Sequence, residues 1–168
     1  HTWSNGGNST GEHFFPEGEF ADRVSNFGGP ESCNSVNMMR LTEILLQMKA
    51  DVKYIDYYEK VLFNHVLANY EPVGGMCCYY TSMRPGHYKI HAYPYDSFWC
   101  CVGTGLEAPA KFAKLIYMHT DNSLYVNMFI PSVLEWKEKG ISVVQQTKYP
   151  DTNSVKLLFE TKESKGVD

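Results

Sequence analysis

The sequence lacks the kinds of segment that would attach it to a membrane or to nucleic acid. No apolar stretch reaches the roughly 18 residues that a membrane-spanning helix needs. The 15 lysines and arginines are scattered and the net charge is −4, which argues against a nucleic-acid-binding protein and against binding to anionic lipid. No signal peptide is visible. Because the chain opens at His1 rather than Met, the compartment stays open, with a periplasmic or secreted location compatible with the sequence.

The chain also lacks a plausible disulfide framework. Its five cysteines are an odd number, and four of them form two adjacent doublets, Cys77-Cys78 and Cys100-Cys101. Adjacent cysteines rarely meet the geometry of a disulfide bond, and an odd count leaves at least one free thiol. The pattern therefore favours metal binding or thiolate chemistry.

What the chain does have is a helical pattern followed by an alternating one. Met38, Leu41, Leu45 and Met48 recur at helical spacing, and a second helix is expected over residues 52–69. A third helix is expected from Gly105 to about Met118, with Thr104 as its N-cap. Residues 1–30 and 71–104 are long Gly- and Pro-containing connections.

The last 50 residues change character, since apolar residues alternate from Leu124 to Ile130, at Ile141 and Val143, and from Val155 to Phe159. Turn residues separate these runs, a pattern typical of an antiparallel sheet with one buried face. We therefore expect a domain boundary near residue 120, between a mainly helical region, 1–120, and a β region, 121–168.

Four residues form a complete donor set for a metal. Glu31 and Cys33 stand two residues apart at an expected helix start, and Cys100-Cys101 lies just before another. One carboxylate and three thiolates suit tetrahedral Zn²⁺, and helix starts stabilise thiolates. Spacing alone leaves the alternative, buried cysteines that act as small apolar residues, about equally good.

Other polar residues in the connections are weaker candidates. Glu12, between glycine and aromatic residues, could serve as a general acid, although an isolated loop carboxylate is more often merely solvated. His13, His87 and His91 are more often ordinary polar contacts, and His65 lies on an apolar helix face as a core histidine would. Cys77 and Cys78 are expected to be packing residues or incidental thiols without a chemical role.

Several strings, in their order along the chain, resemble glycoside hydrolase families 127 and 146, the β-L-arabinofuranosidases. The doublet in its Cys-Cys-Val-Gly-Thr-Gly form looks more like family 146. The matching strings include Gly6-Gly7-Asn8-Ser9, Gly11-Glu12-His13-Phe14, Gly29-Pro30-Glu31-Ser32-Cys33-Asn34, Met83-Arg84-Pro85-Gly86-His87-Tyr88 and Asp96-Ser97-Phe98-Trp99-Cys100-Cys101-Val102-Gly103-Thr104-Gly105.

The resemblance implies the latter part of an (α/α)₆ barrel leading into an antiparallel β-sandwich, with the first half of the barrel supplied by the same full-length protein. It implies Cys100 as both nucleophile and zinc ligand, with Glu31, Cys33 and Cys101 completing the zinc site, and Glu12 as the acid/base. The implied activity is release of β-L-arabinofuranose from a glycan or oligosaccharide. His87 and Tyr80 are the expected substrate contacts.

Three alternatives remain open at this point. The chain could be an inactive piece of an enzyme, or a zinc-stabilised module that binds carbohydrate by aromatic stacking without turnover. A cysteine protease that pairs Cys100 with His87 or His91 is a weaker third, because it gives Cys101, Glu31 and Cys33 no role.

Overall fold

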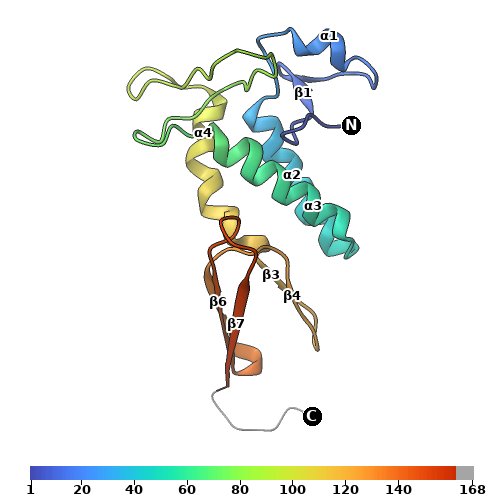
Figure 1. Cartoon of the computed structure of the whole chain (residues 1–168), viewed down its shortest axis with the longest axis vertical. Helices are drawn as coiled ribbons and strands as arrows, with labels where there is room; N and C mark the ends of the chain where they lie inside the picture. Colours follow the sequence, from blue (N-terminus) through green and yellow to red (C-terminus); the bar gives the residue numbers. More distant parts are fainter. Residues whose placement is uncertain (162–168) are drawn as a thin grey trace. The chain divides into compact units, whose positions relative to one another are not determined.

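The computed structural model describes residues 1–161, in which helices come first and antiparallel strands follow (Figure 1). The chain divides into two compact units, His1–Phe112 and Ala113–Asp168. The expected order of helical region and sheet region is confirmed, whereas the division into a barrel region, 1–120, and a sandwich domain, 121–168, stays a prediction. No helix of the described residues is long and apolar enough to cross a membrane.

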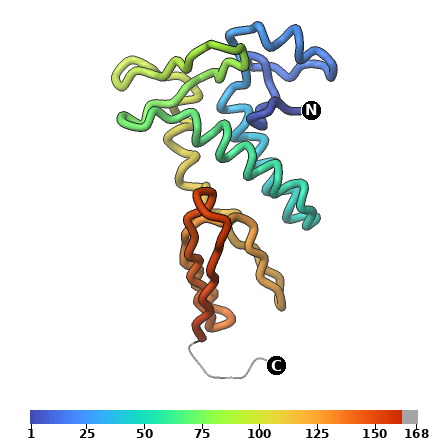
Figure 2. Tube along the Cα trace, in the orientation of Figure 1, coloured from blue at the N-terminus to red at the C-terminus, as the bar shows by residue number. Residues whose placement is uncertain are grey.

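The first unit is built on a helical hairpin. Helix α2 (Ser32–Met48) is followed by α3 (Val52–Val61), which continues through a π-helical turn, Leu62–Val66, and a 3₁₀ turn, Leu67–Asn69. The two helices run side by side in the tube view (Figure 2). The second expected helix is confirmed, and so is its inward face, since Tyr58, Val61 and Val66 are buried.

The inward face expected for the first helix is wrong. Leu41 and Met48 are 45% and 79% exposed, and the buried residues of α2 include Ser35, Val36, Met39, Thr42 and Leu46. Apolar residues cover several sides of this helix, so their spacing does not single out one face. The side that packs is the one on which small Ser35 allows close approach and hydrogen-bonds His65, at 2.7 Å between Oγ and Nδ1.

The third helix also begins earlier than expected. Helix α4 (Cys100–Glu107) has Trp99 as its N-cap and passes into a 3₁₀ segment, Ala108–Leu115. Thr104 is therefore inside the helix, and Leu106, expected to face inward, is 81% exposed. Residues 100–104 were expected to belong to a loop, and Gly103 and Gly105 both lie inside the helix, where glycine has a low intrinsic propensity.

The second unit contains two small antiparallel sheets. Strands β3 (Tyr117–His119) and β4 (Leu124–Val126) pair with each other, and β6 pairs with both β5 and β7. The sequence predicted β6 and β7, and it predicted β4 with an extension to Ile130 that is wrong, since β4 ends at Val126. It assigned Tyr117 and Met118 of β3 to a helix and missed β5. The bounds of the last three strands are β5 (Ser132–Trp136), β6 (Ile141–Thr147) and β7 (Val155–Thr161).

The N-terminal 30 residues pack through aromatic side chains. They contain strands β1 (Ser9–Thr10) and β2 (His13–Phe14) and helix α1 (Phe20–Val24). Trp3, Phe15 and Phe20 form a cluster with ring centroids 4.9–5.3 Å apart. Phe14 and Phe27, in contrast, are more than 60% exposed, so only part of this segment is anchored by its aromatics.

A close approach of two loops positions the start of α2. A Cβ on Gly29 would lie 2.0 Å from the carbonyl oxygen of Thr81, so only glycine fits there. The Thr81 amide donates to the Pro30 carbonyl at 3.0 Å, and the Ser32 amide donates to the Tyr79 carbonyl at 3.1 Å. The chain around Glu31 is thereby held against residues 79–81.

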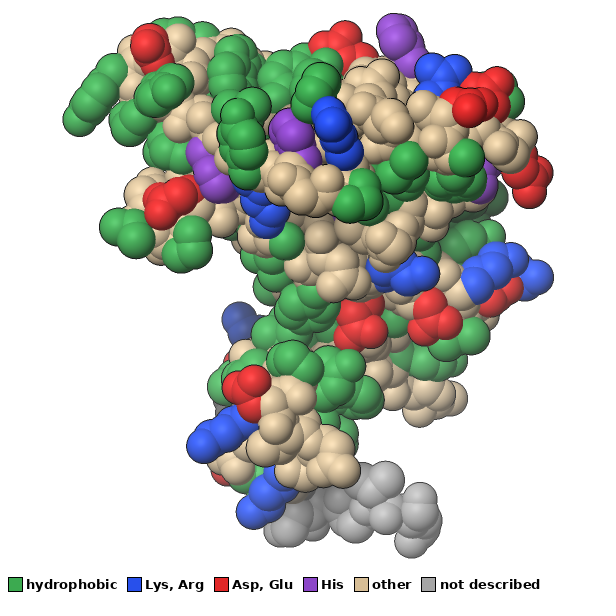
Figure 3. Space-filling model, turned by 45° about the horizontal axis from the view of Figure 1, so that its top comes forward, with side chains coloured by type: hydrophobic (Ala, Val, Ile, Leu, Met, Phe, Trp, Pro, Cys, Tyr) green, Lys and Arg blue, Asp and Glu red, His purple; other side chains and the backbone are tan. Residues whose placement is uncertain are grey.

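Charged side chains are spread over the face seen in Figure 3 without one patch of either sign.

Candidate metal and catalytic centre

The structure brings the four predicted metal donors together in the first unit. Glu31 is the N-cap residue of α2 and Cys33 lies in its first turn, while Cys100 and Cys101 are the first two residues of α4. One donor atom from each residue lies within 4.8 Å of all the others. Both helices begin at the same end of this unit (Figure 1), so two helix N-termini with free N–H groups and positive dipole ends point at the cluster.

The spacing of the donor atoms fits a tetrahedral metal ion. With zinc–sulfur bonds of about 2.3 Å, neighbouring sulfurs of a tetrahedral site lie about 3.8 Å apart. The Sγ of Cys101 is 3.3 Å from that of Cys33 and 4.0 Å from that of Cys100, and Oε1 of Glu31 is 3.7 Å from Cys100 Sγ and 3.8 Å from Cys101 Sγ. These separations are far longer than a disulfide bond of about 2.05 Å, and all five cysteines are free thiols.

Hydrogen bonds between sulfurs link the members of the cluster. The Cys33 thiol donates to the Cys101 sulfur, which lowers the pKa of Cys101 to about 7 and raises that of Cys33 above its usual value. The Cys33 sulfur also lies 3.1 Å from the Thr104 hydroxyl oxygen. Three thiolates and a carboxylate in a mostly buried site would repel one another, so full deprotonation of the cluster requires a bound cation.

The two cysteines of the doublet differ in accessibility. Cys101 is fully buried, whereas Cys100 is exposed. A site closed by four protein ligands is normally structural, but here one of the four ligands, the Cys100 sulfur, can be reached from solvent. This exposed sulfur is what would allow the cluster to take part in chemistry.

Glu12 lies next to the cluster, linked to it by a tyrosine. The Tyr79 hydroxyl donates to Oε1 of Glu12, and its oxygen is 3.5 Å from Cys100 Sγ. Donation to the carboxylate raises the pKa of Tyr79, so the hydroxyl keeps its proton at neutral pH. Gly11, at φ +60, makes the turn that presents Glu12. No pattern in the sequence indicated that Tyr79 links Glu12 to the cluster.

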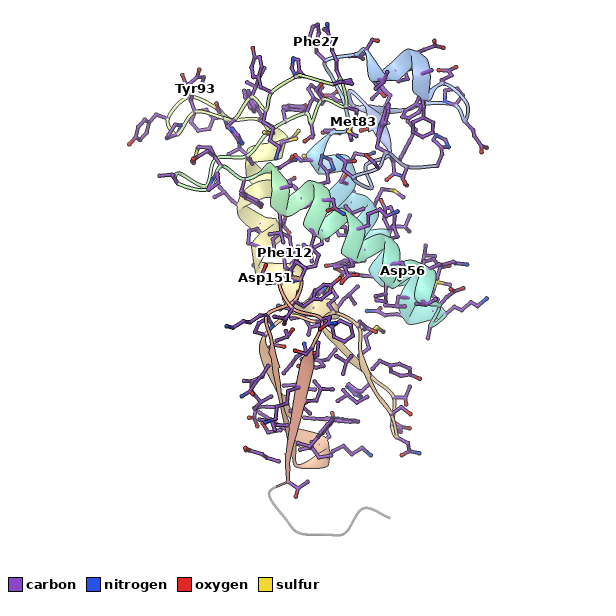
Figure 4. All side chains as sticks on the ribbon, in the orientation of Figure 1. Phe27, Asp56, Met83, Tyr93, Phe112 and Asp151 are labelled. Carbon is purple, nitrogen blue, oxygen red and sulfur yellow. The ribbon has the colours of Figure 1, made fainter. Side chains whose placement is uncertain are left out.

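A cavity of about 640 Å³ opens beside Tyr79. Both predicted substrate contacts, Tyr80 and His87, line it, together with Phe27 and Trp99. Within the described residues, Nδ1 of His87 is buried without a hydrogen-bond partner. Figure 4 shows Phe27 and Met83 on the loops at the end of the unit where α2 and α4 begin. The cavity thus offers aromatic faces, including that of Tyr79, whose hydroxyl oxygen lies 3.5 Å from Cys100 Sγ.

The remaining candidates lie elsewhere. His65 is fully buried, and burial lowers its pKa to about 4, which agrees with the expected core histidine. His13 is exposed on β2. His91 pairs with Cys78 across an isolated antiparallel bridge, and both Cys77 and Cys78 are buried.

Comparisons with known proteins identify the family of both parts of the chain. Residues 1–114 match the family described as beta-L-arabinofuranosidase, GH127 catalytic domain, and residues 123–168 match the GH127 middle domain. The first match alone covers more than half of the chain. A search of curated proteins found no match.

Solved structures show the same fold over nearly the whole chain. A GH127 β-L-arabinofuranosidase from Geobacillus stearothermophilus T6 is 18% identical with a TM-score of 0.72, over 96% of this chain and 27% of that one. A protein described as a glycoside hydrolase is 20% identical with a TM-score of 0.75, over 98% and 32%. A GH127 β-arabinofuranosidase is 18% identical with a TM-score of 0.76, over 94% and 25%. The chain therefore spans a quarter to a third of the length of these proteins.

Proposed function

The chain belongs to the GH127 β-L-arabinofuranosidase family, and we propose that it carries the reaction centre of a retaining glycoside hydrolase that releases β-L-arabinofuranose from a glycan or oligosaccharide. The observation that supports this most is the cluster of one carboxylate and three thiols, one of them exposed, with Glu12 joined to that exposed thiol through Tyr79. Because the solved relatives are three to four times longer, the activity belongs to a larger protein.

At the level of the fold, we propose that the helical unit is the latter part of an (α/α)₆ barrel and that the sheets begin a β-sandwich. A six-hairpin barrel needs about twelve helices, and the described residues supply the α2–α3 hairpin and α4. The exposed apolar residues of α2, Leu41, Ile44 and Met48, are the kind of surface that further helices would cover.

Glu31, Cys33, Cys100 and Cys101 would hold Zn²⁺, as indicated by a donor set rich in sulfur and by tetrahedral spacing. When bound, the ion supplies positive charge that keeps the Cys100 sulfur as a thiolate at neutral pH. Glu31 and Cys101, both buried, fix the position of the site, while Cys100 presents its sulfur to the solvent side.

In the first step, Cys100 Sγ attacks the anomeric carbon of the arabinofuranosyl group and a carbon–sulfur bond forms. The bond between that carbon and the leaving oxygen breaks, and protonated Glu12 gives its proton to this oxygen. Tyr79 has a single hydroxyl proton, which it donates to Glu12. Its oxygen lies beside both Glu12 and Cys100, so it fixes the acid group relative to the nucleophile.

In the second step, water attacks the anomeric carbon while Glu12, now a carboxylate, takes a proton from it. The carbon–sulfur bond breaks, and its electron pair returns to Cys100 as a thiolate. Two displacements at one carbon give retention of configuration. The sugar would bind in the aromatic cavity, with stacking on Tyr80 and a contact with His87, both of which line it.

The test is zinc content and turnover in matched variants. One zinc per chain is expected in the wild type and is lost in Cys101→Ser. In the protein that contains the whole barrel, Glu12→Gln keeps the zinc but lowers kcat on an aryl β-L-arabinofuranoside by about 10²–10⁴. A correctly folded wild type without metal would remove the basis of this mechanism.

The second candidate is a non-catalytic, zinc-stabilised module that binds carbohydrate. It is favoured by the four protein ligands, which normally mark a structural zinc site. The Glu12→Gln variant discriminates between the enzyme and the binding module. In a binding module this change alters neither the metal content nor the affinity for the sugar, and neither the wild type nor the variant forms product.

A further inference from the structure

Cys77 belongs to the doublet that the proposed reaction does not use, yet its side chain lies against a metal donor. It is 6% exposed, and its Sγ lies 3.3 Å from the carbonyl oxygen of Cys101, to which the thiol donates. The backbone of Cys77 is held on both sides, because it pairs with Tyr70 in an antiparallel bridge and its carbonyl accepts from the Ala92 amide at 2.9 Å. The backbone hydrogen bonds thus fix the position from which the Cys77 thiol contacts α4.

A second contact one helical turn further along α4 involves the same segment. The Tyr70 hydroxyl donates to the Gly105 carbonyl at 2.7 Å. A Cβ on Gly105 would lie 2.9 Å from the Cys77 sulfur, which is closer than real Cβ contacts come. The absence of a side chain at Gly105 therefore allows α4 to pack closely against Cys77. Tyr70 and Cys77 thus contact two successive turns on one side of this helix.

These contacts bear directly on the metal centre, because α4 has only eight residues and its first two are donors. A small rotation or slide of its first turn would move both sulfurs relative to Glu31 and Cys33. Cys77 is not itself part of the donor group. Groups that orient metal ligands typically change metal affinity 10- to 100-fold when removed.

We propose that Cys77 is a positioning residue, whose thiol fixes the first turn of α4 so that Cys100 and Cys101 meet Glu31 and Cys33 at metal-binding distance. The proposal rests on the proposed function only in requiring that the four donors hold a metal. The alternative is that Cys77 fills space as a small apolar side chain. Cys78 provides the matched control, since it is fully buried and within the described residues its thiol makes no hydrogen bond to α4.

The experiment is a titration of the full chain with Co²⁺, whose absorption reports both the number of thiolate ligands and the geometry of the site. Wild type and Cys78→Ala are expected to bind one ion with the same spectrum. Cys77→Ala binds it 10- to 100-fold more weakly, with a shifted ligand-field band, and Cys77→Ser, which keeps a donor to the Cys101 carbonyl, recovers most of the affinity. Equal affinity and spectra for Cys77→Ala and Cys78→Ala would overturn the proposal.

A double-mutant cycle tests the contact itself. Gly105→Ala should weaken Co²⁺ binding, because the new methyl group meets the Cys77 sulfur. In the Cys77→Ala background the same change should cost less, since the sulfur is gone. Additive effects would contradict a direct contact. If wild type does not bind Co²⁺ at all, both the metal site and the role of Cys77 fail, whereas equal binding by wild type and Cys77→Ala overturns only the role of Cys77, so the two failures can be told apart.

Discussion

The clearest stability prediction concerns the buried His65. The side chain is fully buried, and burial lowers its pKa from the usual 6.5 to about 4. In the folded protein it is therefore neutral throughout the range in which the unfolded chain takes up a proton. Between pH 6.5 and 4 the unfolded state binds more protons, so the free energy of unfolding falls as the pH is lowered.

The size of the effect follows from that depression. At 1.36 kcal/mol for each pKa unit, a drop from 6.5 to about 4 removes about 3 kcal/mol of stability, all of it lost by pH 4. The stability is fully present above pH 6.5. This is a large share of the 5–15 kcal/mol that typically holds a domain together.

The assay is urea unfolding at a series of pH values with a chelator present, so that metal binding does not add its own pH dependence. Wild type is compared with His65→Asn, which keeps a group that can bond the Ser35 hydroxyl, and with His13→Asn on the exposed strand β2. His65→Asn should show a shallower loss of stability below pH 6.5, while His13→Asn follows the wild type. Parallel curves for all three proteins would refute the reasoning.

Three further predictions concern the site and its supports. Tyr79→Phe should lower kcat more than it changes KM while zinc content stays constant, because the hydroxyl contacts Glu12 and the nucleophile rather than the metal; steady-state kinetics with elemental analysis checks this. Gly103→Ala, in open space within α4, should raise stability by up to about 1 kcal/mol, whereas Gly29→Ala should lower it sharply against the Thr81 carbonyl, both measured by thermal unfolding. A chelator should lower the melting temperature of the zinc-loaded wild type, and added Zn²⁺ should restore it, since a metal that binds only the folded state stabilises it.

Local pattern predicted the elements whose packing follows from their own sequence. The second helix has one apolar face, and Tyr58, Val61 and Val66 on that face are buried as expected. The first helix has apolar residues on several sides, and what decides its packing is the contact between Ser35 and His65, 30 residues apart. Hydrophobic periodicity carries no information about such a contact, so the inward face of α2 could not be predicted from spacing.

At the site, too, residues with a local sequence signal could be predicted, and a residue whose role depends on a long-range contact could not. The four donors were found because carboxylates and thiols at helix starts are local features. Tyr79 was missed because its role depends on a contact with Glu12 across 67 residues, and one tyrosine among many in that connection has no distinguishing local signal. Family resemblance predicts Glu12 as the acid and Cys100 as the nucleophile, but it did not point to the hydroxyl that lies between them.

The error at α4 had the largest consequence for function. With the helix taken to begin at Gly105, nothing in the local sequence distinguished the two cysteines of the doublet, and only the family resemblance assigned Cys100 as the nucleophile. In the structure both cysteines are helical, and successive residues of an α-helix point about 100° apart. One sulfur therefore faces the core and the other faces solvent, which is why Cys101 is buried and Cys100 exposed. A doublet placed in the first turn of a helix thus has one buried thiol and one thiol that solvent can reach, and this follows from helix geometry once the start of α4 is known.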